Sequence, residues 1–163
     1  MSNNRKNFTL KRKMDALIEI RASLLVDEIA KDICKEAKES LDILTAVPIE
    51  FEDMDVTAKT VSGSIRLNPL LIDKDFDIMM RYVIHEMVHV MQHISEGSNI
   101  DDSADNYLDK ESEVAAFQRQ IEFDSVSKTD AEMTEYIEDL MDHHDYPKGD
   151  REKKEEELRE LTD

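Results

Sequence analysis

Residues 82–94 read Tyr-Val-Ile-His-Glu-Met-Val-His-Val-Met-Gln-His-Ile, an apolar run that carries three histidines and one glutamate. The run is compatible with a helix, in which side chains four positions apart share one face. His85 and His89 are therefore spaced to bind one metal ion from adjacent turns. Glu86 lies beside them, where a carboxylate can act as a general base toward a metal-bound water. This stretch predicts a zinc site with hydrolytic chemistry.

The alternative for the same stretch is a pair of surface histidines on an amphipathic helix. Its apolar neighbours argue against that interpretation, because Val83, Ile84, Val88 and Val90 indicate a helix buried on most sides. Polar side chains at buried positions need hydrogen-bonding or metal partners. The flanking sequence therefore favours the metal site.

The composition sets the class of protein. A chain of 163 residues with 40% hydrophobic content fits one domain, residues 1–163. Glycine and proline number only three each, which indicates mostly regular, helix-rich structure. Cys34 is the only cysteine and excludes an internal disulfide and a thiolate zinc site. The sequence shows neither a secretory signal nor an apolar run near the roughly 20 residues that span a bilayer, so a cytoplasmic protein is expected.

The net charge of −18 bears on partners. Such a surface repels phosphate backbones and anionic lipid, so we expect no nucleic-acid and no membrane partner. The hydrolytic motif of residues 85–89 predicts a protein or peptide substrate, and the sequence leaves the oligomeric state undetermined. Residues 1–13 carry a basic cluster and are expected to form a flexible arm.

The first half of the chain predicts helix and then strand. Residues 8 to about 45 show apolar spacing typical of one long helix or two in succession. Ile49, Phe51 and Met54 alternate with acidic residues, as in a half-exposed strand. Residues 60–67 form a second strand candidate that contains Gly63 as a bulge or close-approach point. The two strands are expected to pair.

The second half predicts helices. They are expected from Asp73 or Asp75 to about Ser95, from 110 to about 125, and from about 129 to 142. Gly97 should end the first of them, and residues 98–106 have the composition of a surface loop. Residues 148–163 are densely charged and predict a frayed helical tail. The fold class is therefore α+β and helix-rich.

The third zinc ligand must come from another part of the chain. His93 continues the four-residue spacing, but on an unbroken helix it lies about 12 Å from His85. One ion with bonds of about 2 Å cannot span that distance. His93 is therefore expected to have a supporting, capping or surface role.

An acidic residue on the following helix is the better candidate. Glu113 borders the face formed by Ala116 and Phe117, which should pack on the active-site helix. The small side chains of Ala115 and Ala116 would allow a close approach of the two helices. Glu111 lies nearer the helix start, where an acid also suits the helix dipole. The sequence favours Glu113 and keeps Glu111 as the alternative.

The order of strand, His-Glu-x-x-His helix, loop and acid-bearing helix resembles the zincin superfamily of metallopeptidases. The use of a glutamate ligand is similar to the gluzincins and their compact members, the minigluzincins. A weaker similarity links the same motif, His93, and the Glu-x-Glu and Phe117 of residues 111–117 to the ImmA/IrrE regulatory metallopeptidases. Val114-Ala115 stands where those proteins carry Ala-Asn. The resemblance covers roughly residues 58–125.

The resemblance implies a zincin-like compact domain that binds one zinc ion per chain. It assigns His85, His89 and Glu113 as metal ligands and Glu86 as the catalytic base. It also implies that residues 60–67 form an edge strand that pairs with an extended substrate. The predicted function is hydrolysis of peptide bonds through a metal-bound water.

Two supporting roles stay open at this level. Candidates for stabilising the oxyanion are Tyr82, Tyr107, Tyr136, His143 and His144. Asp105 and Asp109 are candidate partners for a ligand imidazole. Two other functions also remain: a catalytically inactive, acidic binding or regulatory protein, and a latent peptidase covered by its N-terminal helix or its C-terminal tail.

Overall fold

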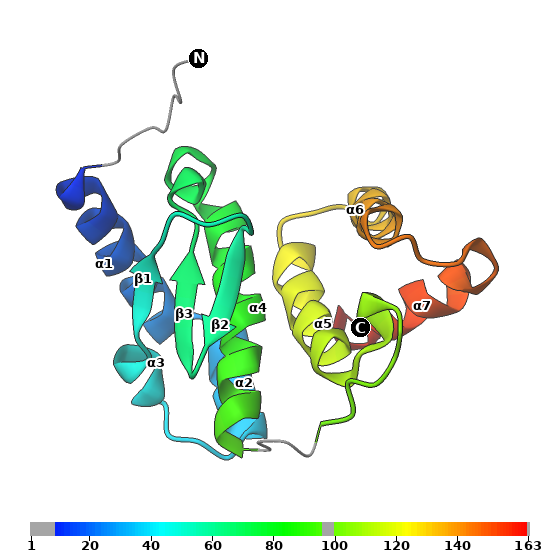
Figure 1. Ribbon diagram of the computed structural model, residues 1–163, viewed down its shortest axis with the longest axis horizontal. Coiled ribbons are helices and arrows are strands. Elements are labelled where there is room, and N and C mark those ends of the chain that lie inside the picture. Colours follow the sequence, from blue (N-terminus) through cyan, green and yellow to red (C-terminus); the bar gives the residue numbers. More distant parts are fainter. Residues whose placement is uncertain (1–8, 96–99, 163) are drawn as a thin grey trace.

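The computed structural model describes residues 9–95 and 100–162 and shows a small sheet among many helices (Figure 1). The helices are α1 Leu10–Val26, α2 Glu28–Glu36, α3 Ile43–Ala46, α4 Phe76–Ser95, α5 Glu111–Ser125, α6 Asp130–His143 and α7 Arg151–Leu158. The strands are β1 Ile49–Phe51, β2 Ala58–Val61 and β3 Ser64–Leu67. The prediction of a helix-rich α+β fold is confirmed.

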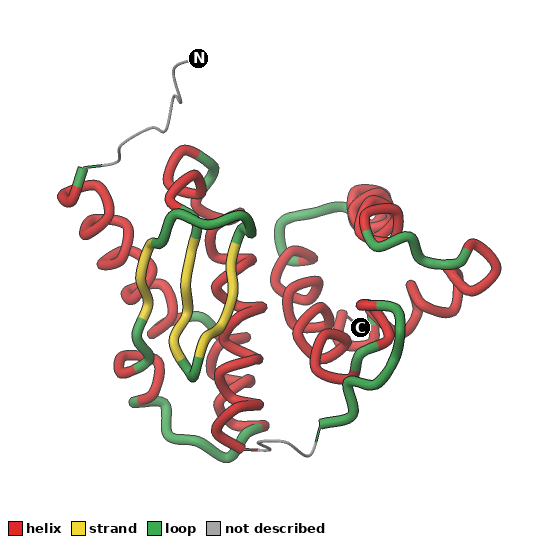
Figure 2. The backbone as a smooth tube through the Cα atoms, in the orientation of Figure 1, coloured by secondary structure: helices red, strands yellow, loops and turns green. Residues whose placement is uncertain are grey.

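The sheet has the order β1-β3-β2. Strand β1 runs parallel to β3, with Ile49 opposite Ile65, and β2 runs antiparallel to it, with Val61 opposite Ser64. Ile65 and Leu67 are fully buried and fix the face of β3 that packs on the helices. Figure 2 shows the short strands side by side in front of the helical layer.

The prediction of one strand over residues 60–67 was wrong, because this segment contains a hairpin. Ser62 and Gly63 have φ angles of 50° and 81° and form a two-residue turn between β2 and β3. Paired positive φ angles match the twist of antiparallel strands, which is why such turns favour glycine. Gly63 is thus a turn residue and not a bulge. The edge strand is β2, and β3 lies at the centre.

The N-terminal helical region is also divided more finely than expected. Asp27 has an extended backbone that ends α1, and its side chain accepts a hydrogen bond from the backbone N–H of Ala30 to cap α2. An aspartate at this position is a strong helix-start signal. The short helix α3 follows. Residues 1–8 of the expected arm lie outside the described residues, and α1 begins at Leu10, so residues 10–13 are helical and not a flexible arm.

Helix α4 confirms the helix predicted from Asp73 or Asp75 to about Ser95, and it lies at the centre of the fold. It contacts α2, β2 and β3 on one side and α5 on another. Its apolar residues Val83, Ile84 and Met87 are fully buried. Gly97, expected to end this helix, lies outside the described residues. No helix in the described part of the chain is long and apolar enough to cross a membrane.

A second hydrophobic core lies between α5, α6 and α7, beyond α4 from the sheet (Figure 1). Helix α5 joins both cores, because Ala116 packs into the first and Ile121 into the second. The expected fraying of the tail was wrong for α7. Leu158 is fully buried in the second core. The ammonium of Lys154 is also buried and lies 2.7 Å from Oδ1 of Asp109, so the charged segment is anchored at two points.

Candidate metal centre

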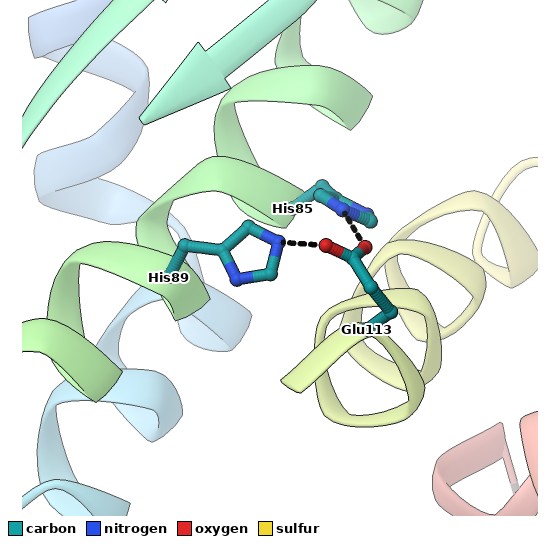
Figure 3. A group of neighbouring side chains, drawn as sticks. All are labelled: His85, His89 and Glu113. Carbon is teal, nitrogen blue, oxygen red and sulfur yellow. Dashed lines mark hydrogen bonds and ion pairs between the residues drawn. The ribbon is translucent and has the colours of Figure 1, made fainter. Parts of the chain in front are cut away.

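Helices α4 and α5 bring together three side chains of types that can bind a metal ion (Figure 3). Nε2 of His85 lies 3.1 Å from Oε2 of Glu113, and Nε2 of His89 lies 2.9 Å from Oε1 of the same carboxylate. The donor atoms of the three residues all lie within 4.8 Å of one another. The structure thus places the three predicted ligands close enough together to share one metal ion.

The start of α5 explains why Glu113, and not Glu111, meets the histidines. Asp102 accepts hydrogen bonds from the backbone N–H and the hydroxyl of Ser112, at 2.9 and 2.6 Å, which fixes the first turn. Glu111 is exposed and accepts a hydrogen bond from the backbone N–H of Asp101. Glu113 is buried and faces α4. The packing of Ala116 in the interface allows this close approach.

Two glutamines hold the other ring nitrogens of the histidines. Nδ1 of His85 lies 2.7 Å from Oε1 of Gln120, and Nδ1 of His89 lies 2.8 Å from Oε1 of Gln92. Gln92 also donates a hydrogen bond to the carbonyl of Ser112, which ties α4 to α5. These contacts leave each Nε2 directed at the shared centre, the arrangement that ligand imidazoles need.

The expected partners Asp105 and Asp109 were therefore wrong. Asp105 is exposed, and Asp109 instead accepts a hydrogen bond from the hydroxyl of Tyr146. The sequence carries a signal for the two glutamines in their spacing from the proposed ligands. Gln92 follows His89 by three positions and Gln120 follows Glu113 by seven, spacings that put each pair on one helix face.

Glu86 lies next to this cluster in the wall of a cavity of about 590 Å³. Its side chain is buried, and its Oε2 accepts a hydrogen bond of 2.7 Å from the hydroxyl of Thr60 on β2. The cavity also reaches the hairpin turn and His93, which is exposed and outside the three-ligand group. The predicted base and two of the three predicted ligands, His89 and Glu113, thus line one cavity.

The aromatic candidates have distinct positions. Tyr107 lines the cavity, and its ring stacks on that of His144 at a centroid distance of 4.6 Å. Tyr136 instead accepts a hydrogen bond from the side chain of Gln120. Tyr82 packs against the first core, and His143 contacts His144 edge-on. Of these aromatic candidates, Tyr107 is the one that lines the cavity and could donate a hydrogen bond into it.

The carboxylate and the histidines shift one another's protonation. Burial alone would lower the pKa of His89, but the hydrogen bond and charge of Glu113 outweigh it and raise that pKa to about 9. Burial likewise opposes ionisation of Glu113, yet its bonds to His85 and His89 hold its pKa well below the usual range. Partial burial and the neighbouring Glu113 raise the pKa of Tyr107, so its hydroxyl stays protonated at neutral pH.

Comparisons with protein-family models, curated proteins and solved structures found no match. The donor chemistry is the remaining guide to the ligand of this site. Two imidazole nitrogens and one carboxylate are a set that suits catalytic zinc, which keeps a fourth position open for water or substrate. Nε2 of both histidines faces the carboxylate of Glu113, and the three residues together fit a zinc ion.

Proposed function

We propose that this protein is a zinc-dependent metallopeptidase with a zincin-like domain. His85, His89 and Glu113 hold one zinc ion per chain, and Glu86 is the general base. The observation that carries the proposal is the meeting of the two histidines from α4 with the glutamate from α5, beside a buried carboxylate in the same cavity. A coincidental pair of surface histidines would not be expected to share a buried acid.

Bound zinc supplies polarisation of the substrate carbonyl and a lowered pKa for water, which is about 15.7 in bulk. The protein supplies the proton transfers. Glu86 is held at the cavity wall by Thr60, where it accepts a proton from water and then delivers it to the leaving amine. A carboxylate fixed by one hydrogen bond keeps its second oxygen available for this transfer.

Tyr107 is the residue we assign to stabilising the carbonyl oxygen as negative charge develops there. Its raised pKa keeps the hydroxyl proton in place, so the group is a hydrogen-bond donor at neutral pH. Stacking on His144 holds the ring at the cavity wall. A donor fixed before the reaction is more effective than one that must reorganise.

The substrate we propose is an extended peptide lying along β2. This strand pairs with β3 on one side, and its residues 58–60 line the cavity on the other. Main-chain hydrogen bonds to such an edge provide affinity with little demand on sequence. Among the described residues, neither α1 nor α7 contributes to the cavity lining, which argues against a latent form covered by either helix.

The decisive experiment compares the wild-type protein with Glu86→Gln. The variant should keep about one zinc per chain, measured by elemental analysis of tag-free protein, and should lose hydrolysis of a peptide library. Zinc retained without hydrolysis in the wild type would instead support a catalytically inactive, acidic binding protein. Absence of zinc from the wild type after zinc is supplied would refute the metal site itself.

A further inference from the structure

Helix α1 is apolar on two opposite faces. Its buried face is formed by Ala16, Ile20 and Leu24, which pack into the first core. The other face is an apolar stripe, the α1 stripe, whose side chains are between 47% and 74% exposed: Leu10, Met14, Ile18, Leu25 and Val26. Each lies four, seven or eight positions from Ile18, spacings that share one side of a helix. A helix that is apolar all round is normally buried, so the stripe indicates a surface that another molecule covers.

The α1 stripe lies away from the candidate metal centre. Figure 1 shows α1 at the side of the molecule opposite α6 and α7. Among the described residues, neither hydrophobic core includes a side chain of the stripe, and the cavity lining includes no residue of α1. A molecule bound along the stripe would therefore leave the cavity open.

The charges around α1 oppose its helix dipole. The start of the helix is basic, with Lys11 and Lys13 near its first turn, whereas Asp27 and Glu28 follow its end. The first turn holds no acid and the last turn no base. Because a helix carries partial positive charge at its start and partial negative charge at its end, both ends place like charges together. A second copy lying antiparallel would bring the basic start of one helix beside the acidic end of the other.

The pattern of α1 selects a second copy of this chain as the occupant. The stripe needs a partner helix of similar length that has an apolar face, an acidic end and a basic end. Helix α1 itself has all of these features. An anionic membrane would attract only the basic end and would repel a chain of net charge −18. Twofold dimers, in which one patch meets its own copy, are the commonest assemblies of soluble proteins.

The α1 stripe also specifies a register for the pair. Ile18 lies eight positions from both Leu10 and Val26, so a twofold axis beside Ile18 would align the two stripes over their full length. Met14 would then lie opposite Ala22 of the second copy. A long side chain would meet a small one there, which allows the two helices to pack closely.

Opposite charges flank the same centre. Asp15 would lie opposite Arg21 of the second copy, whose guanidinium is held in place by hydrogen bonds to the carbonyl groups of Leu44 and Val47. The 17 residues of α1 span about 25 Å at about 1.5 Å per residue. One helix pair of this length makes a small interface, the size class typical of transient association.

We propose that this protein forms a reversible twofold dimer in which the α1 stripes of two copies pack antiparallel about Ile18. The inference depends neither on the zinc site nor on peptidase activity. Both cavities of the dimer stay open to substrate, because α1 takes no part in their lining.

The first test is sedimentation velocity of the tag-free protein over a range of concentrations. The wild type should shift from monomer toward dimer as its concentration rises. Ile18→Glu places two carboxylates at the twofold centre and should weaken self-association by about 30-fold or more, as the loss of a central contact does. Val126→Glu is the matched control, since it adds the same charge at a side chain that is 83% exposed at the end of α5, and should leave the dimer unchanged. Circular dichroism checks that each variant is folded.

Disulfide cross-linking under mild oxidation tests the orientation of the pair. In a mixture, Met14→Cys and Ala22→Cys chains should cross-link mainly to each other, because these two positions face across an antiparallel pair. In a parallel pair, each variant would cross-link to its own kind. The native Cys34 is fully buried, and burial raises the pKa of its thiol, so it should not compete.

A wild type that stays monomeric at every concentration would overturn the proposal, and binding of that monomer to anionic lipid vesicles would assign the stripe to a membrane instead. A dimer that survives Ile18→Glu, or that Val126→Glu weakens equally, would place the interface elsewhere and overturn it as well. Self-cross-linking of each cysteine variant without the mixed product would refute the antiparallel arrangement. All of these outcomes can be read without zinc and without a substrate, so they are separate from the test of the proposed function.

Discussion

The hydroxyl of Thr60 donates a hydrogen bond of 2.7 Å to Oε2 of Glu86 and so joins the edge strand to the proposed base. The same hydroxyl lies 3.2 Å from the backbone carbonyl of Glu86. One oxygen of the carboxylate is thereby fixed, and the other can face the reacting water. The strand proposed to bind the peptide thus also orients the proposed base.

The first prediction is that Thr60→Val slows peptide hydrolysis without releasing zinc. Hydrogen bonds to charged groups contribute about 1.5–3 kcal/mol. Loss of part of that energy from the transition state corresponds to a fall in kcat of about tenfold or more. Steady-state kinetics and elemental analysis of the same sample measure the two effects. Thr60→Ser keeps the hydroxyl and should recover most of the rate, and failure to do so would show that the methyl group matters more.

The second prediction concerns Tyr107. Tyr107→Phe keeps the ring that stacks on His144 and removes only the donor. We expect kcat to fall by about 100-fold, the lower end of the cost of losing one oxyanion donor, with zinc affinity nearly unchanged. The control is Tyr82→Phe, which alters a tyrosine packed against the first core. Equal rates for Tyr107→Phe and the wild type would remove Tyr107 from the mechanism.

The third prediction separates the two acids of α5. Glu113→Gln should weaken zinc binding by more than the roughly 10- to 100-fold typical for outer partners, because a direct ligand and its charge are lost. Glu111→Gln removes an equal charge two residues earlier in the chain. Because Glu111 is exposed, this change should leave zinc affinity unchanged. Isothermal titration gives both constants. The reverse order of effects would make Glu111 the ligand.

Whether a feature could be predicted from the sequence depended on how far apart along the chain its interacting residues lie. The His-Glu-x-x-His helix and its ligand spacing were predictable, because residues four apart on one helix share a face whatever else the chain does. Glu113 could be predicted as a ligand because it borders the helix face formed by Ala116 and Phe117. These are local rules, and the structure places all three proposed ligands together.

The contacts between elements were not predictable in the same way. Thr60 reaches Glu86 only because the Ser62-Gly63 turn makes β2 an edge strand above α4. Alternation of polar and apolar residues continues through that turn, so a single longer strand fitted the sequence equally well. Tyr136 and Gln120 are likewise brought together by the packing of α6 on α5, which no residue spacing specifies.

The fourth prediction is that zinc affinity rises with pH up to about 9. The raised pKa of His89 means that the metal-free protein holds a proton there below this pH, and zinc must displace it. Affinity should therefore rise by about tenfold per pH unit for this proton and level off above pH 9. The free energy of unfolding of the metal-free protein should depend on pH in the opposite direction. The contribution of protonated His89 is complete below its unfolded pKa of about 6.5 and is lost as pH rises through about 9.

Calorimetric titration in buffers of different ionisation enthalpy measures the protons released per zinc ion bound. We expect about one at neutral pH and close to none above pH 9 from this group. Thermal unfolding of the metal-free protein across the same range checks the opposite trend. A zinc affinity that is flat between pH 6.5 and 9 would contradict the proposed ion pair between His89 and Glu113.

The fifth prediction tests whether the charged C-terminal segment belongs to the folded unit. Leu158 is fully buried in the second core, so Leu158→Ala should lower the free energy of unfolding by about 2–5 kcal/mol, measured by urea denaturation. Leu161→Ala is the matched control and should cost less, because Leu161 is only partly buried. Lys154 of the same helix connects α7 to the candidate site. Its ammonium donates a hydrogen bond to the carbonyl of Leu108, next to Tyr107, so loosening α7 should reduce kcat more than it reduces zinc affinity.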